Sequence, residues 1–142
     1  MDLTMSFPRS PRERLAGICM LARTVDKARA KAASKLGEYI FDCPMDRRLF
    51  EAMRTDGAEF FEVVAGAEDD AAVVSWFTRN GHMPRGTDVE SLNDAIDRWA
   101  PKTDESRGRF EKQREVIAPG RPDISTWTDL IDAEEGRSPR GA

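Results

Sequence analysis

Residues 10–37, SPRERLAGICMLARTVDKARAKAASKLG, carry the clearest structural signal in this chain. Ser10, Pro11 and Glu13 match a capping box with proline at the first helical position. Apolar side chains then recur at steps of three and four, the spacing of one face of a helix. They are Leu15, Ile18, Ala22, Val25, Ala32 and Leu36. With Gly37 as the stop signal, we expect a long first helix of about 25 residues.

The rest of the chain predicts further, shorter helices. Apolar clusters at helical spacing alternate with glycine, proline and aspartate breakers, and Thr87 opens a second capping box. No segment alternates between polar and apolar residues as a strand would. We therefore expect an all-α fold, a single compact bundle of six to eight helices. The boundaries we expect are an irregular N-terminal arm at 1–9, one helical domain at 10–136 and a flexible tail at 137–142.

Composition and charge limit the classes of protein. The chain has 142 residues, 39% apolar side chains and a net charge of −4, typical of a globular protein. No apolar run approaches the roughly 20 residues of a membrane span, and no signal peptide is evident. We therefore expect a soluble, cytoplasmic protein with no membrane contact and with two free thiols, Cys19 and Cys43. No motif predicts a cofactor.

The first helix places charges on its own apolar face. Arg29 lies about 10° from the centre of the apolar stripe and Asp26 about 70° from it, with Arg23 at the edge. An arginine there needs a carboxylate, a carbonyl or a ligand, because burying it alone costs several kcal/mol. One interpretation is a buried ion network. A second is an anion pocket in which Arg23 and Arg29 bind a phosphate or carboxylate and Asp26 orients them. A third is that the helix ends early and Arg29 is simply exposed to solvent.

A second polar cluster lies near the C-terminus around Trp127. Asp129, Asp132 and Glu135 are the carboxylates that could hold a hard divalent cation there. Because no loop has the spacing of a calcium site, a solvated acidic helix facing the basic first helix is the simpler interpretation.

Long motifs at both ends of the chain resemble one family. The opening motif is Ser10-Pro11-Arg12 followed by Arg23-x-x-Asp26-Lys27-x-Arg29. The closing motif is Asp123-Ile124-Ser125-Thr126-Trp127-x-Asp129-x-Ile131-Asp132-x-x-Glu135-Gly136-Arg137. Together they are similar to an uncharacterised family of small bacterial proteins, a domain of unknown function. The resemblance implies no activity or cofactor, but its signature polar residues coincide with the two clusters above.

Our first functional hypothesis is a site for a small anionic ligand between the first and last helices. Its candidate binding residues are Arg23, Asp26, Lys27, Arg29, Tyr39, Trp127, Asp129 and Asp132. If the chain is an enzyme, Asp26 or Asp129 is the candidate acid or base.

Two alternatives belong to other classes. The chain is an accessory protein that binds another protein, and its Arg/Asp network is structural. Alternatively, the basic N-terminal segment with Arg9, Arg12 and Arg14 binds nucleic acid weakly, although the acidic chain as a whole makes this unfavourable.

Overall fold

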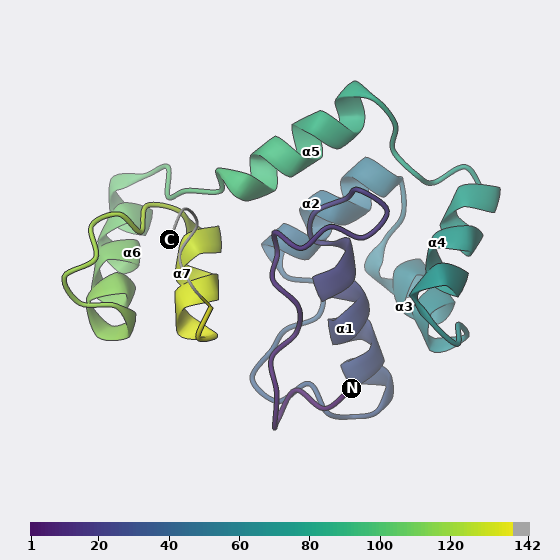
Figure 1. Cartoon of the computed structure of the whole chain (residues 1–142), viewed down its shortest axis with the longest axis horizontal. Helices are drawn as coiled ribbons and strands as arrows, with labels where there is room; N and C mark the ends of the chain where they lie inside the picture. The colour runs from purple at the N-terminus through teal and green to yellow at the C-terminus, as the bar shows by residue number, and fades with distance from the viewer. Residues whose placement is uncertain (138–142) are drawn as a thin grey trace. The chain divides into compact units, whose positions relative to one another are not determined.

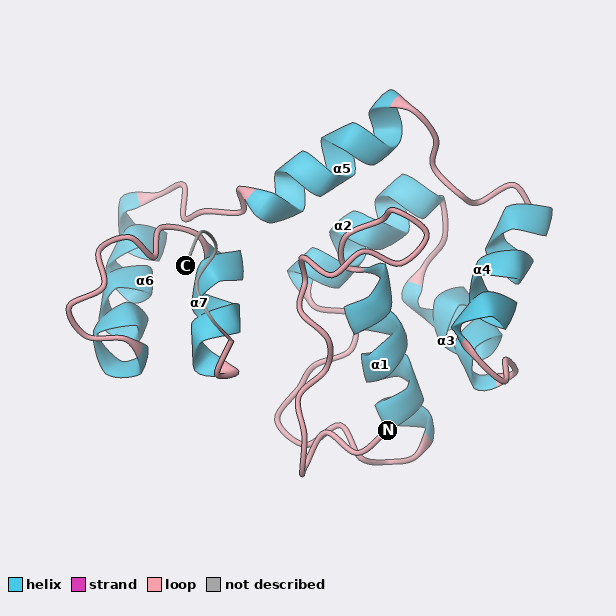
Figure 2. Ribbon diagram, in the orientation of Figure 1, coloured by secondary structure: helices cyan, strands magenta, loops and turns pink. Residues whose placement is uncertain are grey.

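The computed structural model describes residues 1–137, which form seven α-helices and no strand (Figures 1 and 2). The helices are α1 (Leu21–Ala32), α2 (Pro44–Met53), α3 (Gly57–Ala65), α4 (Asp70–Arg79), α5 (Thr87–Asp97), α6 (Asp104–Ile117) and α7 (Trp127–Glu134). The predicted all-α class is confirmed. Apart from its first residue, the tail expected at 137–142 lies outside the described residues.

The prediction of a long first helix is wrong, because α1 has only 12 residues. Before it the backbone turns repeatedly: Ala16, Gly17 and Met20 have φ values of 53°, 78° and 72°. Ser10 makes a turn rather than a helix cap, since its hydroxyl accepts from the backbone N–H of Arg12. The backbone N–H of Met20 donates to the carbonyl of Pro11 at 2.8 Å, a bond that an uninterrupted helix would not make.

The C-terminal end of α1 also differs from the expectation. Ser34 adopts a left-handed conformation with φ 57°, and the N–H of Lys35 donates to the Ala30 carbonyl at 2.8 Å. Gly37 therefore does not stop the helix. It lies in the segment that receives the N-terminal arm, where a Cβ would come within 3.0 Å of the Leu3 carbonyl oxygen.

The chain divides into two compact units, 1–93 and 94–142. In the first unit α3 packs against α1 and also contacts α2 and α4. Aromatic rings fill its core: the Phe60 ring centroid lies 5.1 Å from that of Phe50 and 5.4 Å from that of Phe77. The single domain expected over 10–136 is not tested by this division and stays a prediction.

In the second unit α6 and α7 pack against each other. Phe110, Ile124 and Leu130 are buried between them, and Trp127 meets Phe110 edge to face with centroids 5.0 Å apart. Trp127 also donates its backbone N–H to the carbonyl of Trp99 at 2.6 Å. Each unit thus has a core of its own.

Within 1–137, every helix is too short or too polar to cross a lipid bilayer.

Candidate functional site

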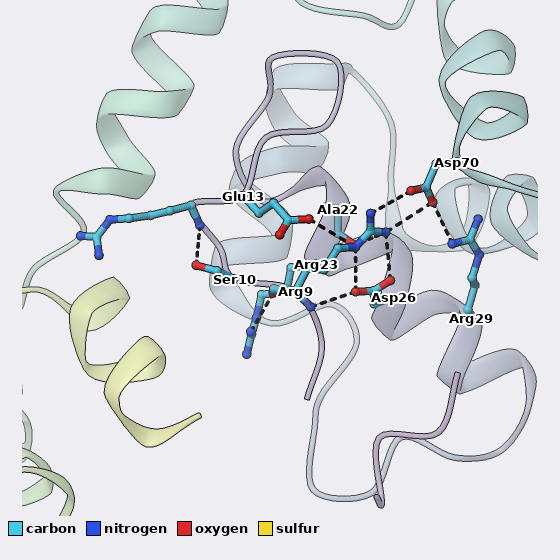
Figure 3. Close-up of polar contacts among 9 residues, drawn as sticks. Arg9, Ser10, Glu13, Ala22, Arg23, Asp26, Arg29 and Asp70 are labelled. Atoms are coloured by element: carbon cyan, nitrogen blue, oxygen red, sulfur yellow. Dashed lines mark hydrogen bonds and ion pairs between the residues drawn. The ribbon is translucent and has the colours of Figure 1, made fainter. Parts of the chain in front are cut away.

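Arg9 of the N-terminal arm is the centre of the polar cluster on α1 (Figure 3). Its side chain donates to both oxygens of Asp26, from Nε at 3.0 Å and from Nη2 at 3.0 Å. Its backbone N–H adds a third bond to Asp26 at 2.8 Å, so the arm and the helix are joined by main chain and side chain together. Asp26 is 2% exposed, and its carboxylate forms an ion pair with the Arg9 guanidinium.

Asp70, in the first turn of α4, connects this pair to Arg29. Arg9 donates to Asp70 from Nη1 at 2.8 Å, and Arg29 Nη1 donates to the other Asp70 oxygen at 2.8 Å. The hydrogen bond from Arg9 is the main reason that the pKa of Asp70 lies below its usual range. Burial acts to lower the pKa of Arg9, but its bonds to Asp70 and Asp26 raise it overall.

Lys27 belongs to a second ion pair on another side of α1. Its Nζ donates to Asp46 Oδ2 at 2.6 Å, and both side chains are almost fully buried. Asp46 also accepts from the Thr24 hydroxyl at 2.8 Å and from the backbone N–H of Cys43, which precedes α2. Cys43 Sγ lies 3.4 Å from Lys27 Nζ. Because these bonds join α1 to the start of α2, the buried pair fixes the packing of the two helices.

Arg23 and Tyr39, the remaining first-unit candidates, lie together. Arg23 Nη1 donates to the Arg9 carbonyl at 3.1 Å, and its guanidinium carbon lies 5.5 Å from the centre of the Tyr39 ring. Arg23 is buried and Tyr39 is half-buried. The structure therefore brings five expected residues to one helix and the segment after it: Arg23, Asp26, Lys27, Arg29 and Tyr39.

The C-terminal candidates belong to the second unit. Arg137 Nη1 donates to Asp132 at 3.1 Å and to Glu135 at 2.5 Å, and Asp129 accepts from the N–H of Ser125 at 3.4 Å. Among residues 1–137, no three His, Cys, Asp or Glu side chains are placed to hold a metal ion. The meeting of the first and last helices at one site stays a prediction.

Arg29 keeps one donor unused. Its Nη2 atom is buried and has no hydrogen-bond partner within the described part of the chain. The residue borders an open cavity of 430 Å³ lined by Arg29, Glu68, Asp69, Asp70 and Ala71. Three carboxylates beside one guanidinium make this cavity acidic, which weakens the case for an anion there.

Sequence reasoning missed the partners of this network. Arg9 was assigned to a basic arm, whereas Asp46 and Asp70 resemble ordinary residues of the first helical turn, where carboxylates are common. All three lie 17 or more residues away from the α1 side chain that they contact. The only available signal was the unmatched charge on the apolar face of α1, which indicates that partners exist but not where they are.

One comparison identifies relatives of the chain. The family model described as Domain of unknown function (DUF5069) matches residues 5–137. That range contains both the opening and the closing motif, so the resemblance is confirmed. No curated protein matches the chain.

Proposed function

Because the chain belongs to the DUF5069 family, which has no assigned function, we propose its role from its own chemistry: a non-enzymatic, protein-binding accessory domain whose Arg/Asp network is structural. The observation that carries this proposal is that three carboxylates all accept hydrogen bonds from the protein itself. Both oxygens of Asp26, Asp46 and Asp70 accept hydrogen bonds from donors of the same unit. A general base must lie within hydrogen-bond reach of a substrate proton, and Asp26 and Asp46 are buried with their oxygens directed at donors of the protein.

The network also fixes the N-terminal arm, and with it the apolar side chains that the arm exposes to solvent. Arg9 holds the end of the arm to α1, and Leu3 donates its N–H to the Lys35 carbonyl at 2.9 Å near the start of the arm. Between these two attachments Met5 is 84% exposed and Phe7 is 55% exposed. Large apolar side chains on an anchored segment favour contact with another protein, because burying them there removes apolar area from water at little cost in ordering the arm.

Substitution of Arg9 tests the structural part of the proposal. Arg9→Met leaves the buried Asp26 carboxylate without a countercharge and should lower the free energy of unfolding by about 3 kcal/mol. Arg79→Met is the matched control, because Arg79 is exposed and has no ion pair among residues 1–137, so it should change stability by less than about 0.5 kcal/mol. Urea unfolding measures both. Equal stability of the two variants would contradict the proposal.

A photo-crosslinking residue tests the binding part. Placed at Phe7 in living cells, it should yield a discrete covalent adduct with another protein. The same residue placed at Arg79 should not yield that adduct. Identical adducts from both positions, or none from Phe7, would contradict the assigned surface.

A second candidate function, the binding of a small anion at α1, is favoured by the unused Nη2 donor of Arg29. A purely structural Arg29–Asp70 pair would leave the same donor unused. The test must therefore measure stability and ligand binding separately. Under the anion hypothesis Arg29→Met abolishes ligand binding and leaves stability nearly unchanged. Under the structural hypothesis it lowers stability by about 1 kcal/mol, because Asp70 keeps Arg9 as a partner.

A further inference from the structure

Three cavity-lining arginines of the first unit form no ion pair with the described residues. Arg48, Arg54 and Arg85 are exposed, and none makes a side-chain hydrogen bond or an ion pair within residues 1–137. They line two neighbouring cavities that share Ala52, Arg54 and Asp88. The contrast with Arg9 and Arg29 is clear, since the donors of those residues are directed at carboxylates of the fold.

The first cavity, of 270 Å³, lies between the end of α2 and the loop that precedes α5. Its lining is Ala52, Arg54, Thr78, Gly81, His82, Met83, Pro84, Arg85 and Asp88. The second, of 320 Å³, adds Arg48, Glu51, Ser91 and Leu92. The α5 helix begins at Thr87, so its N-terminus borders both cavities and contributes a partial positive charge there.

Arg54 occupies a backbone position that suits it poorly. It caps the C-terminus of α2 in the left-handed region, with φ 51° and ψ 46°. Glycine is the usual residue at such a position, because it has no Cβ to clash with the following carbonyl, and asparagine is tolerated because its side chain can hydrogen-bond locally. The guanidinium of Arg54 makes no hydrogen bond or ion pair within the described residues that would offset this strain. A strained residue beside a cavity is typical of a functional site.

The charges and hydrogen-bonding groups that line the cavities indicate the kind of ligand. Arginine side chains present paired N–H donors that match the oxygens of a phosphate group. Asp88 offers acceptor oxygens and Ser91 a hydroxyl, which suit the alcohol groups of a small organic phosphate. We propose that this cavity pair binds a phosphomonoester that carries hydroxyl groups, with Arg54 and Arg85 holding the phosphate and Asp88 accepting from a hydroxyl. This site goes beyond the protein-binding role and uses none of the α1 network.

Glycerol 3-phosphate and inorganic phosphate serve as probes, titrated into the full chain at constant ionic strength and followed by calorimetry. We expect saturable binding of glycerol 3-phosphate in the millimolar range or tighter and weaker binding of inorganic phosphate. Arg54→Gly should weaken binding by at least about tenfold, because charge-assisted hydrogen bonds to the phosphate are lost. The same variant should raise the midpoint of thermal unfolding, because glycine relieves the left-handed strain.

Two controls make the result decisive. Arg85→Ala should weaken binding as Arg54→Gly does, and Arg79→Ala, whose arginine lines neither cavity, should bind like the unmodified chain. Absence of saturable binding by either probe would overturn the proposal, as would equal affinity of the Arg54→Gly and Arg79→Ala variants. Because Arg9 lies outside these cavities, the outcome of the Arg9→Met experiment does not influence this result.

Discussion

The arginines on and around α1 and those beside the loop before α5 behave in opposite ways. Arg9 and Arg29 direct donors at carboxylates of their own unit, whereas Arg54 and Arg85 have no such partner in the described chain. The difference follows from location. A charge on a helix face that packs into the core must be neutralised inside the protein, but a charge at the rim of a cavity is left to solvent or to a ligand. The unpaired set is therefore the better place to look for binding.

Lys27→Met should give the largest effect that this comparison predicts. The substitution leaves Asp46, which is 0% exposed, with polar partners but no countercharge. We expect the free energy of unfolding to fall by about 3 to 5 kcal/mol. Urea unfolding followed by circular dichroism measures it.

Lys35→Met is the matched control, because Lys35 is largely exposed and pairs with Asp2, which is only half-buried. It should change stability by less than about 1 kcal/mol. If the two lysine variants were equally stable, the distinction between internal and external charges would not hold for α1.

The sequence predicts the helices of this fold better than their ends. Capping residues and apolar spacing are local signals, which is why the all-α class and a helix count within the expected range are correct. The error at α1 has a tertiary cause. Cys19 donates its backbone N–H to the Asn93 side chain at 2.8 Å, and Asn93 donates to the Gly17 carbonyl at 2.9 Å. These bonds stabilise an irregular segment that local periodicity assigns to a helix.

The candidate site follows the same rule. The out-of-place charges of α1 were visible because their positions conflict with the apolar face, and Arg23 and Asp26 are indeed buried. Lys27 was a candidate only through the family motif, and the apolar spacing did not indicate its burial. The partners of these charges were not visible, since ion pairing over long sequence separations leaves no periodic trace. The unpaired arginines had no signal at all, because surface arginines are ordinary until a structure shows a cavity beside them.

Loss of the Asp70 charge, by acid or by substitution, should lower the free energy of unfolding less than Lys27→Met does. The loss matters because Asp70 links Arg9 to Arg29. The hydrogen bond from Arg9 lowers the pKa of Asp70 in the folded state. The stabilisation is therefore fully present above the unfolded pKa of about 3.9, and it is lost as the pH falls through the folded pKa. Asp70→Asn should lower stability by about 1 to 2 kcal/mol at neutral pH.

Urea unfolding of both proteins as a function of pH measures this link. The difference in unfolding free energy between them should stay constant down to a pH of about 5 and shrink below about 4. A difference that stayed constant through the acid range would mean that the Asp70 charge does not stabilise the fold.

The smallest effect on stability is expected for Arg85→Met. The side chain has no ion pair to lose within residues 1–137, and its cavity is open to solvent, so the free energy of unfolding should change by less than about 0.5 kcal/mol. Urea unfolding without added phosphate checks this, with Lys27→Met as the destabilised reference. A loss above about 1 kcal/mol would show that Arg85 is a structural residue like Arg9. Unchanged stability would mean that the charge of Arg85 contributes nothing to folding. That charge would then remain available to a ligand, as a binding residue requires.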